Sequence, residues 1–156
     1  MRIAACFGLA LAGLMLLPPP LQAGDSGSRA AYVGGTVAGL PSKTEGTLTI
    51  NDPEAMSFRL KSGTIRVLYS RVNTLEYGQT VGRRYVSAIL ISPLLLLAKK
   101  RRHYLTVGFT DDEGQQQAMV FEVEKGQIRA VLAGLEARTG RRVEFQDEEA
   151  RKSGKG

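Results

Sequence analysis

Patterns of side chains typical of catalysis or metal binding are sparse in this 156-residue chain. The single histidine, His103, would act as a general base only with a carboxylate or a nucleophile beside it in space, and we expect a surface histidine. The acidic run Asp111–Glu113 offers oxygen ligands for calcium, but the spacing of an EF-hand loop is missing, which favours a solvated turn. One histidine and one cysteine, Cys6, are too few for a structural zinc site. The sequence therefore predicts no catalytic residue, no metal site and no cofactor.

The most distinctive segment is a run of fourteen residues without charge, Tyr85–Ala98, which is bracketed by basic residues. Arg83 and Arg84 precede it and Lys99–Arg102 follow it, so six of the 21 Lys and Arg residues lie there. We expect this segment to contact a membrane or a partner protein. The residues predicted to make the contact are Arg83, Arg84, Ile89, Leu90, Ile91, Leu94, Leu95, Leu96, Leu97, Lys99, Lys100, Arg101 and Arg102.

Three interpretations of Tyr85–Ala98 remain open. An apolar run of about 10–14 residues is typical of a core or interfacial element, so the segment would pack on the domain. Alternatively it would dip into a membrane, because a helix of this length measures about 21 Å, short of the roughly 30 Å hydrocarbon core, and Pro93 would interrupt it. Its flanking cations would each contribute about 1 kcal/mol at an anionic surface. Lastly, it would form an oligomer or partner interface that covers the apolar patch.

The amino end has the organisation of a secretory signal peptide. Arg2 supplies a positive charge, Ile3–Leu17 is free of charge, and Pro18–Pro20 end the apolar stretch. Ala23 is a small residue at the expected cleavage point, so the mature chain would begin at Gly24. The alternatives are an uncleaved anchor, for which the apolar run is short, and a lipobox ending at Cys6, which lies ahead of most of that run. We expect an exported protein of the periplasm or cell envelope, peripheral to the membrane.

Export would leave a mature chain without cysteine, so its core must stabilise the fold without a disulfide. Removal of residues 1–23 leaves 20 basic and 15 acidic residues, and outside residues 83–102 the two signs nearly balance. A surface for polyanions is therefore not indicated. The run Lys99–Arg102 is similar to a nuclear localisation or nucleic-acid patch, but export excludes the first and the absence of interleaved aromatic residues disfavours the second. We predict no nucleic-acid partner.

The rest of the chain reads as short strands and then one helix. Alternation of apolar and polar residues, interrupted by turn residues, is typical of an antiparallel sandwich or barrel. The predicted strands are Tyr32–Ala38, Gly46–Asn51, Ser57–Lys61, Thr64–Tyr69, Val72–Tyr77, Tyr104–Thr110 and Gln116–Glu124, with Val143–Phe145 as a candidate for a further short one. The acidic turn Asn51–Glu54 and the tip Asp111–Gly114 separate pairs of them.

A change of period marks the helix. Ile128, Val131, Leu132 and Leu135 follow the spacing of one helical face, and Gly140 is a natural helix stop. We predict an α+β, mainly β fold: a bent antiparallel sheet or small barrel of six to seven strands with one C-terminal amphipathic helix. The domain organisation would be a signal peptide at 1–23, a flexible segment at 24–31, the domain at 32–145 with the apolar insert 85–98, and a disordered charged tail at 146–156.

This order resembles the pleckstrin-homology-like superfold, including its GRAM branch. The stretches Ile65–Gly78, His103–Asp112, Val120–Lys125 and Leu132–Gly140 are also similar to a group of uncharacterised exported bacterial proteins, and the likeness covers residues 32–145. The resemblance implies a module that binds phosphoinositides, peptides or proteins, without a common catalytic site. The usual headgroup site is a basic set in the first hairpin loop, whereas the comparable loop near Asn51–Glu54 is acidic, which argues against phosphoinositides.

The sequence thus favours a non-enzymatic module bound to an anionic membrane surface or a membrane protein through residues 83–102. The alternative is a protein-interaction or homo-oligomerisation module that buries 85–98 at its interface.

Overall fold

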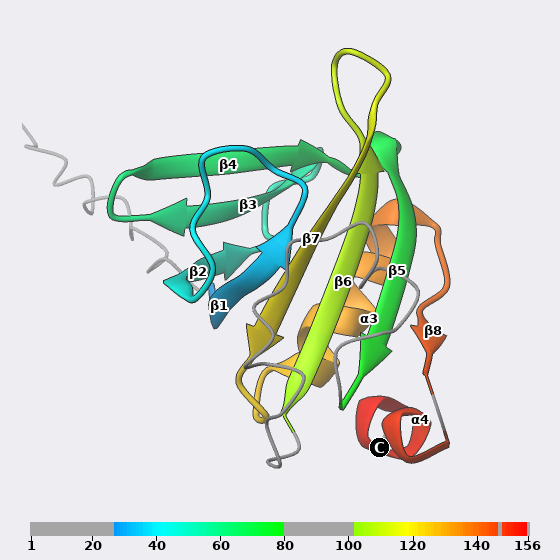
Figure 1. Ribbon diagram of the computed structural model, residues 1–156. Helices are drawn as coiled ribbons and strands as arrows, with labels where there is room; N and C mark the ends of the chain where they lie inside the picture. Colours follow the sequence, from blue (N-terminus) through cyan, green and yellow to red (C-terminus); the bar gives the residue numbers. More distant parts are fainter. Residues whose placement is uncertain (1–26, 80–101, 147, 156) are drawn as a thin grey trace, which may run out of the picture.

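The computed structural model describes residues 27–79, 102–146 and 148–155 (Figure 1). The described part is mainly β, with eight strands, two helices and one 3-10 turn. The strands are β1 (Ser28–Gly35), β2 (Thr44–Thr49), β3 (Ala55–Leu60), β4 (Gly63–Leu68), β5 (Val72–Gly78), β6 (His103–Thr110), β7 (Gln116–Val123) and β8 (Glu144–Phe145). The helices are α3 (Ile128–Thr139) and α4 (Glu148–Lys155), and the 3-10 turn is η1 (Tyr69–Arg71).

The strands form one sheet in the order β4-β3-β2-β1-β7-β6-β5-β8. Every pairing is antiparallel except that of β5 with the short β8, which is parallel and makes the sheet mixed. The sheet does not close on itself, so the barrel alternative is wrong. The α+β, mainly β class is confirmed, whereas the predicted six to seven strands and single helix are each too few.

A bulge bends the sheet where its two halves meet. The register of β1 on β7 shifts between Tyr32 and Gly34, so Val33 is the extra residue in β1. Gly35 permits the close approach there, because a Cβ on it would lie 2.2 Å from the Ala118 carbonyl oxygen. Bulges increase local twist and bend the strand that carries them. Figure 1 shows the result: β3 and β4 run across the direction of β5, β6 and β7.

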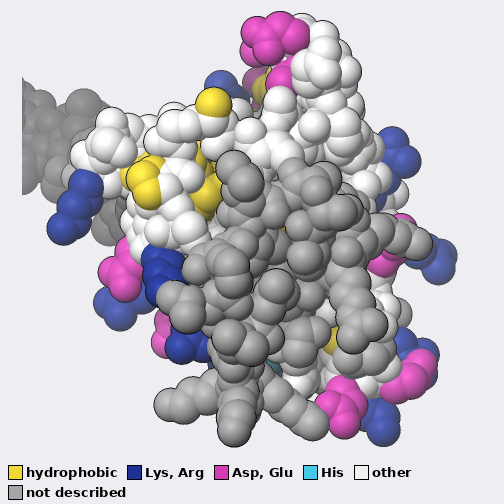
Figure 2. Space-filling view, viewed as in Figure 1, with side chains coloured by type: hydrophobic (Ala, Val, Ile, Leu, Met, Phe, Trp, Pro, Cys, Tyr) yellow, Lys and Arg dark blue, Asp and Glu magenta, His cyan; other side chains and the backbone are white. Residues whose placement is uncertain are grey.

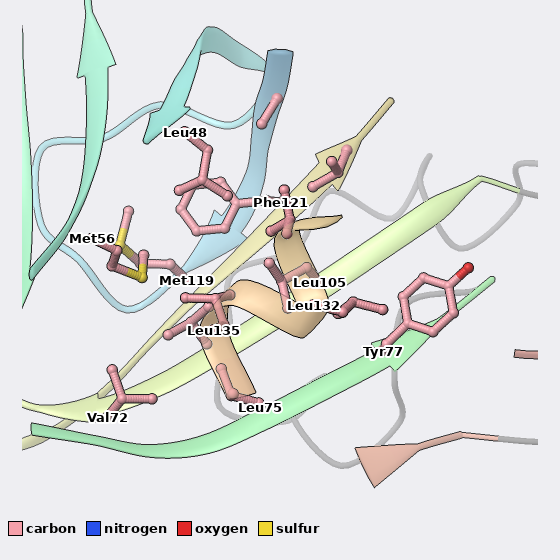
Figure 3. Close-up of a cluster of buried hydrophobic side chains, with 14 of the residues drawn as sticks. Leu48, Met56, Val72, Leu75, Tyr77, Leu105, Met119, Phe121, Leu132 and Leu135 are labelled. Carbon is pink, nitrogen blue, oxygen red and sulfur yellow. The ribbon is translucent and has the colours of Figure 1, made fainter. Parts of the chain in front are cut away.

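Helix α3 covers the inner face of this bent sheet. Its predicted apolar stripe is confirmed, because Ile128, Val131, Leu132 and Leu135 are all buried. In Figure 3, Leu132 and Leu135 lie among side chains contributed by β2, β3, β5, β6 and β7. The predicted helix stop is also confirmed: Gly140 has φ 68° and its N–H donates to the Glu136 carbonyl oxygen at 3.0 Å.

The charged C-terminal stretch differs from the expected disordered tail. Residues 148–155 form α4, whose inner side carries the small residues Ala150, Ser153 and Gly154 at helical spacing. A Cβ on Gly154 would lie 2.6 Å from the Phe145 ring and 3.3 Å from Tyr77 and Leu132 atoms. Close approach through small residues thus docks α4, and a scan for large apolar residues does not detect such a contact.

The first hairpin loop is also not the one expected. The loop between β1 and β2 comprises residues 36–43, and Lys43 is its only charged residue. The acidic turn Asn51–Glu54 instead joins β2 to β3. Asp52 shapes this second turn, since its Oδ1 accepts hydrogen bonds from the backbone N–H of Glu54 at 2.8 Å and Ala55 at 3.1 Å.

Truncation of Leu135 tests the role of α3 as the cover of the sheet. Leu135 is fully buried, so Leu135→Ala is expected to lower the free energy of unfolding by about 2–5 kcal/mol. The exposed control Arg142→Ala is expected to change it by less than about 0.5 kcal/mol. Urea denaturation of both variants measures the difference, and similar losses would show that α3 is not part of the cooperative core.

Substitution of Gly154 tests the small-residue contact of α4. Gly154→Val is expected to destabilise the docked helix by about 1–3 kcal/mol, because the added carbons overlap the Phe145 ring. Lys152→Val, on the exposed side of the same helix, is the control for helix propensity. Amide hydrogen exchange within α4 is the measurement, and equal loss of protection in both variants would contradict the contact.

Candidate functional site

The two ends of the segment 80–101 meet at one end of the sheet. Gln79 follows β5, Arg102 precedes β6, and the Arg102 N–H donates to the Gln79 carbonyl oxygen at 3.4 Å. The last pair of the ladder, Gly78 opposite Tyr104, lies beside this bond. The chain therefore leaves and rejoins the domain at a single place, the end of β5 and β6 remote from the tip between β6 and β7 (Figure 1).

Arg102 is tied to the sheet at this place. Its Nη1 donates to both carboxylate oxygens of Glu122, at 2.6 and 2.7 Å. The pKa of Arg102 is raised, and these hydrogen bonds are the largest cause. The two side chains are 46% and 26% exposed, so the pair is screened by water and holds position more than it adds stability. Arg102 thus anchors the returning chain.

Of the residues predicted to contact a membrane or partner, the structure describes Arg102 alone. The remaining twelve lie outside the described residues: Arg83, Arg84, Ile89, Leu90, Ile91, Leu94, Leu95, Leu96, Leu97, Lys99, Lys100 and Arg101. The described residues establish only where the segment 80–101 leaves and rejoins the domain, at Gln79 and Arg102.

A buried hydrogen-bond cluster supports the same end of the sheet. The fully buried Tyr77 directs its hydroxyl to His103 Nδ1 at 2.5 Å and to Ser153 Oγ at 2.9 Å. The Tyr77 and His103 rings are parallel, with centroids 6.0 Å apart. Gln79 Nε2 donates to Ser153 Oγ at 3.2 Å. His103 is therefore partly buried and engaged, which corrects the expected surface histidine: the strand pairing places it against Tyr77.

The cluster joins α4 to the sheet and does not activate a nucleophile. His103 contacts the tyrosine hydroxyl, while the Ser153 hydroxyl is within hydrogen-bond distance of the Ala150 carbonyl oxygen at 3.0 Å. When the neutral imidazole accepts at Nδ1, the Tyr77 hydroxyl donates to His103 and the Ser153 hydroxyl donates to Tyr77. When Nδ1 carries the proton, His103 donates to Tyr77, Tyr77 donates to Ser153, and Ser153 donates to the Ala150 carbonyl oxygen. In both arrangements the Ser153 hydroxyl proton is used in a hydrogen bond within the cluster.

Further cations lie around this end of the domain. The pKa of His103 is lowered mainly by burial and secondly by the charge of Lys125, which follows β7. Arg129, in the first turn of α3, donates from Nε to the Ser153 carbonyl oxygen at 3.1 Å. Arg29 in β1 adjoins the same turn, since its N–H donates to Gln127 Oε1 at 2.8 Å. These cations lie near the place where the segment 80–101 departs, together with the carboxylates Glu122 and Glu124.

The outer face of β5 and β6 carries polar groups with spare hydrogen-bonding capacity. Glu76, Tyr104 and Thr106 alternate with core residues, so they lie on the face opposite α3. All three are buried, and within the described part of the chain neither Glu76 Oε2 nor the Tyr104 hydroxyl has a hydrogen-bond partner. Burial raises the pKa of Tyr104. The sequence offered no signal for these residues beyond their place in predicted strands.

In the acidic tip between β6 and β7, the Asp111 carboxylate accepts hydrogen bonds from the turn itself and from β7. Asp111 Oδ1 accepts from the backbone N–H of Glu113 at 3.1 Å and Gln115 at 2.7 Å, and Oδ2 accepts from Gln117 Nε2 at 2.7 Å. The Gln117 bond is the main cause that lowers the pKa of Asp111. Among the described residues, no group of three or more His, Cys, Asp or Glu side chains is placed to hold a metal ion.

Comparison with known proteins gives no family for this chain. No protein-family model matches it, and no curated protein is significantly similar to it. Within the described ranges, no helix is both long enough and apolar enough to cross a membrane.

The lowered pKa of His103 predicts a pH-dependent stability. Unfolded histidine takes up its proton near pH 6.5, whereas folded His103 takes it up only at lower pH. The unfolded state therefore binds more protons between these two pKa values, so the stability seen above pH 6.5 falls as the pH is lowered through this window. His103→Gln keeps a side chain that hydrogen-bonds and removes the titration. Urea denaturation at pH 7.5 and 5 should show a larger loss for the wild type than for His103→Gln.

The carboxylates serve as the internal control for this experiment. The pKa values of Asp52 and Asp111 are lowered from 3.8, so both stay ionised in the folded state at either pH and contribute equally to the two proteins. Parallel pH profiles for wild type and variant would contradict the assignment to His103.

Proposed function

We propose that this chain is an exported, non-enzymatic binding module that associates with an anionic membrane surface, or with a membrane protein, through residues 83–102. The observation that carries the proposal is the meeting of Gln79 and Arg102 across a 3.4 Å backbone hydrogen bond. It brings together the two points that residues 80–101 connect, and the sequence has a basic run within five residues of each point, with fourteen uncharged residues between the runs.

Chain length limits how far the basic residues extend from this point. Arg84 is five residues beyond Gln79, and Lys99 is three residues before Arg102. At about 3.6 Å per extended residue, these two reach no more than about 18 Å and 11 Å from their anchors. Chain length therefore keeps both basic runs within this reach of the two anchors. Positive charge concentrated at one place suits an anionic surface better than charges spread over the domain.

The composition of the segment supplies the remaining attraction. Each cation near an anionic leaflet contributes about 1 kcal/mol, and each leucine of the run 94–97 adds roughly 1.5–3 kcal/mol when fully buried. The combination of an apolar chain and a polybasic flank is the two-signal arrangement that stable peripheral binding needs.

The strand order is consistent with the resemblance to the pleckstrin-homology-like superfold, which we keep as part of the proposal. In the described part of the chain, seven antiparallel strands precede α3, as that superfold implies. The first hairpin loop, however, carries Lys43 as its only charged residue, which does not support a phosphoinositide headgroup site there. We therefore assign membrane contact to residues 83–102.

A second candidate is a protein-interaction or homo-oligomerisation module. It is favoured by the composition of residues 85–98, because a run of fourteen uncharged residues that does not enter a membrane needs another surface to cover it.

Vesicle flotation tests the membrane proposal. The chain from Gly24 onward is expected to float with vesicles containing anionic phospholipid and to float less with zwitterionic vesicles. Deletion of 85–98 is expected to abolish flotation. The deletion should fold, because Gln79 and Arg102 are already adjacent and residues 80–84 and 99–101 suffice to connect them.

Charge variants provide the matched control. The triple change Lys99→Gln, Lys100→Gln and Arg101→Gln is expected to weaken flotation by about 3 kcal/mol, or roughly 100-fold in partition coefficient. The triple change Lys43→Gln, Arg141→Gln and Arg142→Gln removes the same charge from exposed positions away from the segment and should have a small effect. Equal recovery of wild type and deletion in the soluble fraction would refute membrane binding, and a defined dimer in light scattering would then favour the second candidate.

A further inference from the structure

A groove lies away from the departure point of the segment 80–101, beside β4. It has a volume of about 550 Å³ and runs between β4, the start of the first hairpin loop and the tip region of β6 and β7. Its apolar lining comes from Val37, Ile65, Val67, Leu68 and Phe109. Among the described residues, Leu68 is the one large hydrophobic side chain that is exposed, at 36%. Figure 2 shows hydrophobic side chains exposed over β4 and the neighbouring loop.

One wall of this groove is an unpaired sheet edge. In the described sheet β4 is the end strand and pairs with β3 alone. Antiparallel residues alternate between those bonded to the neighbour and those facing away. Because the Tyr69 N–H donates back to the Glu54 carbonyl oxygen at 2.9 Å, the alternate residues Leu68, Arg66 and Thr64 direct their backbone N–H and C=O groups to the free edge.

This edge has little of the protection that natural sheets give to edge strands. Charged side chains, proline and bulges are the usual devices, whereas the β4 pairing is regular and Arg66 is its only charged residue. The Arg66 guanidinium lies toward the turn between β2 and β3, 3.1 Å from Asp52 and 3.7 Å from Glu54. It is engaged there by two carboxylates.

The surroundings of the groove carry more negative than positive charge. Arg71 pairs with Asp112 across the mouth, and Arg66 is matched by the carboxylates of its own turn. Figure 2 shows acidic side chains gathered at the tip between β6 and β7. Five carboxylates lie in this region with three arginines, namely Asp52, Glu54, Asp111, Asp112 and Glu113 with Arg66, Arg71 and Arg138, whose Nη2 donates to the Asn51 carbonyl oxygen at 3.3 Å. An occupant with a positive charge near the tip is therefore favoured.

From these observations we infer that the groove binds an extended peptide segment of a partner protein, which adds to the free edge of β4 as a further strand and places a lysine or arginine beside the acidic tip. Backbone bonds to Thr64, Arg66 and Leu68 provide the attachment, as in other cases of strand addition. Apolar side chains at alternate positions of the peptide fill the space beside Leu68 and Phe109. The inference does not depend on the proposed role of residues 83–102.

A peptide titration followed by NMR tests the inference. The probe is acetyl-Lys-Thr-Val-Thr-Val-Thr-amide, added to the isotope-labelled chain from Gly24 onward. We expect the backbone amide signals of Thr64, Arg66 and Leu68 to shift more than those of Ile65 and Val67, because only the former face the incoming strand. A peptide with glutamate in place of lysine should bind at least tenfold more weakly.

Paired variants separate edge pairing from side-chain effects. Arg66→Pro removes one edge N–H while sparing the bonds to β3, since proline is tolerated at sheet edges. Arg66→Ala loses the same ion pairs and keeps the N–H. The proline variant should bind the probe at least tenfold more weakly than the alanine variant, with both folded by their amide spectra. Equal binding by the two, or no shift in β4 at millimolar peptide, would overturn the inference.

The oligomeric state is measured on the same samples. Sedimentation of the unlabelled chain should give a monomer in the absence of the probe. A concentration-dependent dimer that is lost in Arg66→Pro and retained in Arg66→Ala, without probe binding, would overturn the inference and assign the edge to a second copy of the chain.

Discussion

Contact between the apolar stripe of α3 and the inner face of the bent sheet is the interaction on which the rest of the structure depends. An open sheet with its core on one side is stable only when something excludes water from that side, and α3 does so with four buried aliphatic residues. The bulge at Val33 makes the cover possible, because it turns β3 and β4 across β5, β6 and β7. Without the bend, one helix could not contact both halves.

The open sheet has two places of different character. At the end of β5 and the start of β6, the backbone hydrogen bond between Arg102 and Gln79 fixes both attachment points of the segment 80–101. The cluster of Tyr77, His103 and Ser153 reinforces that end by docking α4. At the margin of the sheet, the outer edge of β4 has no strand paired with it among the described residues. The attachment point of the segment 80–101 and the proposed peptide site therefore lie on different parts of the described sheet.

Local pattern predicted the individual elements well and their assembly less well. Sequence pattern identified β2 to β7, and the spacing of Ile128 to Leu135 identified α3 together with its stop at Gly140, because these signals arise from neighbouring residues. The first strand was placed too late in the chain: β1 begins at Ser28, inside the segment 24–31 that was expected to be flexible. The docking of α4 was missed because its contact uses Ala150, Ser153 and Gly154, whose small size becomes favourable only once Tyr77, Phe145 and Leu132 lie opposite them. The predicted six to seven strands were too few for a related reason, because β8 has two residues and forms only through its pairing with β5.

The sequence by itself determined the chemical character of this protein: a mainly β chain, a basic-flanked apolar segment, a single histidine and a single cysteine. These properties are local, since each depends on the order of nearby residues. Tertiary structure decided which of them meet. It placed His103 against Tyr77, brought the two sides of the segment 80–101 to one point, and left the edge of β4 unpaired beside an acidic turn. Those relations join residues far apart in the chain, and strand pairing sets them in a way that no local pattern specifies.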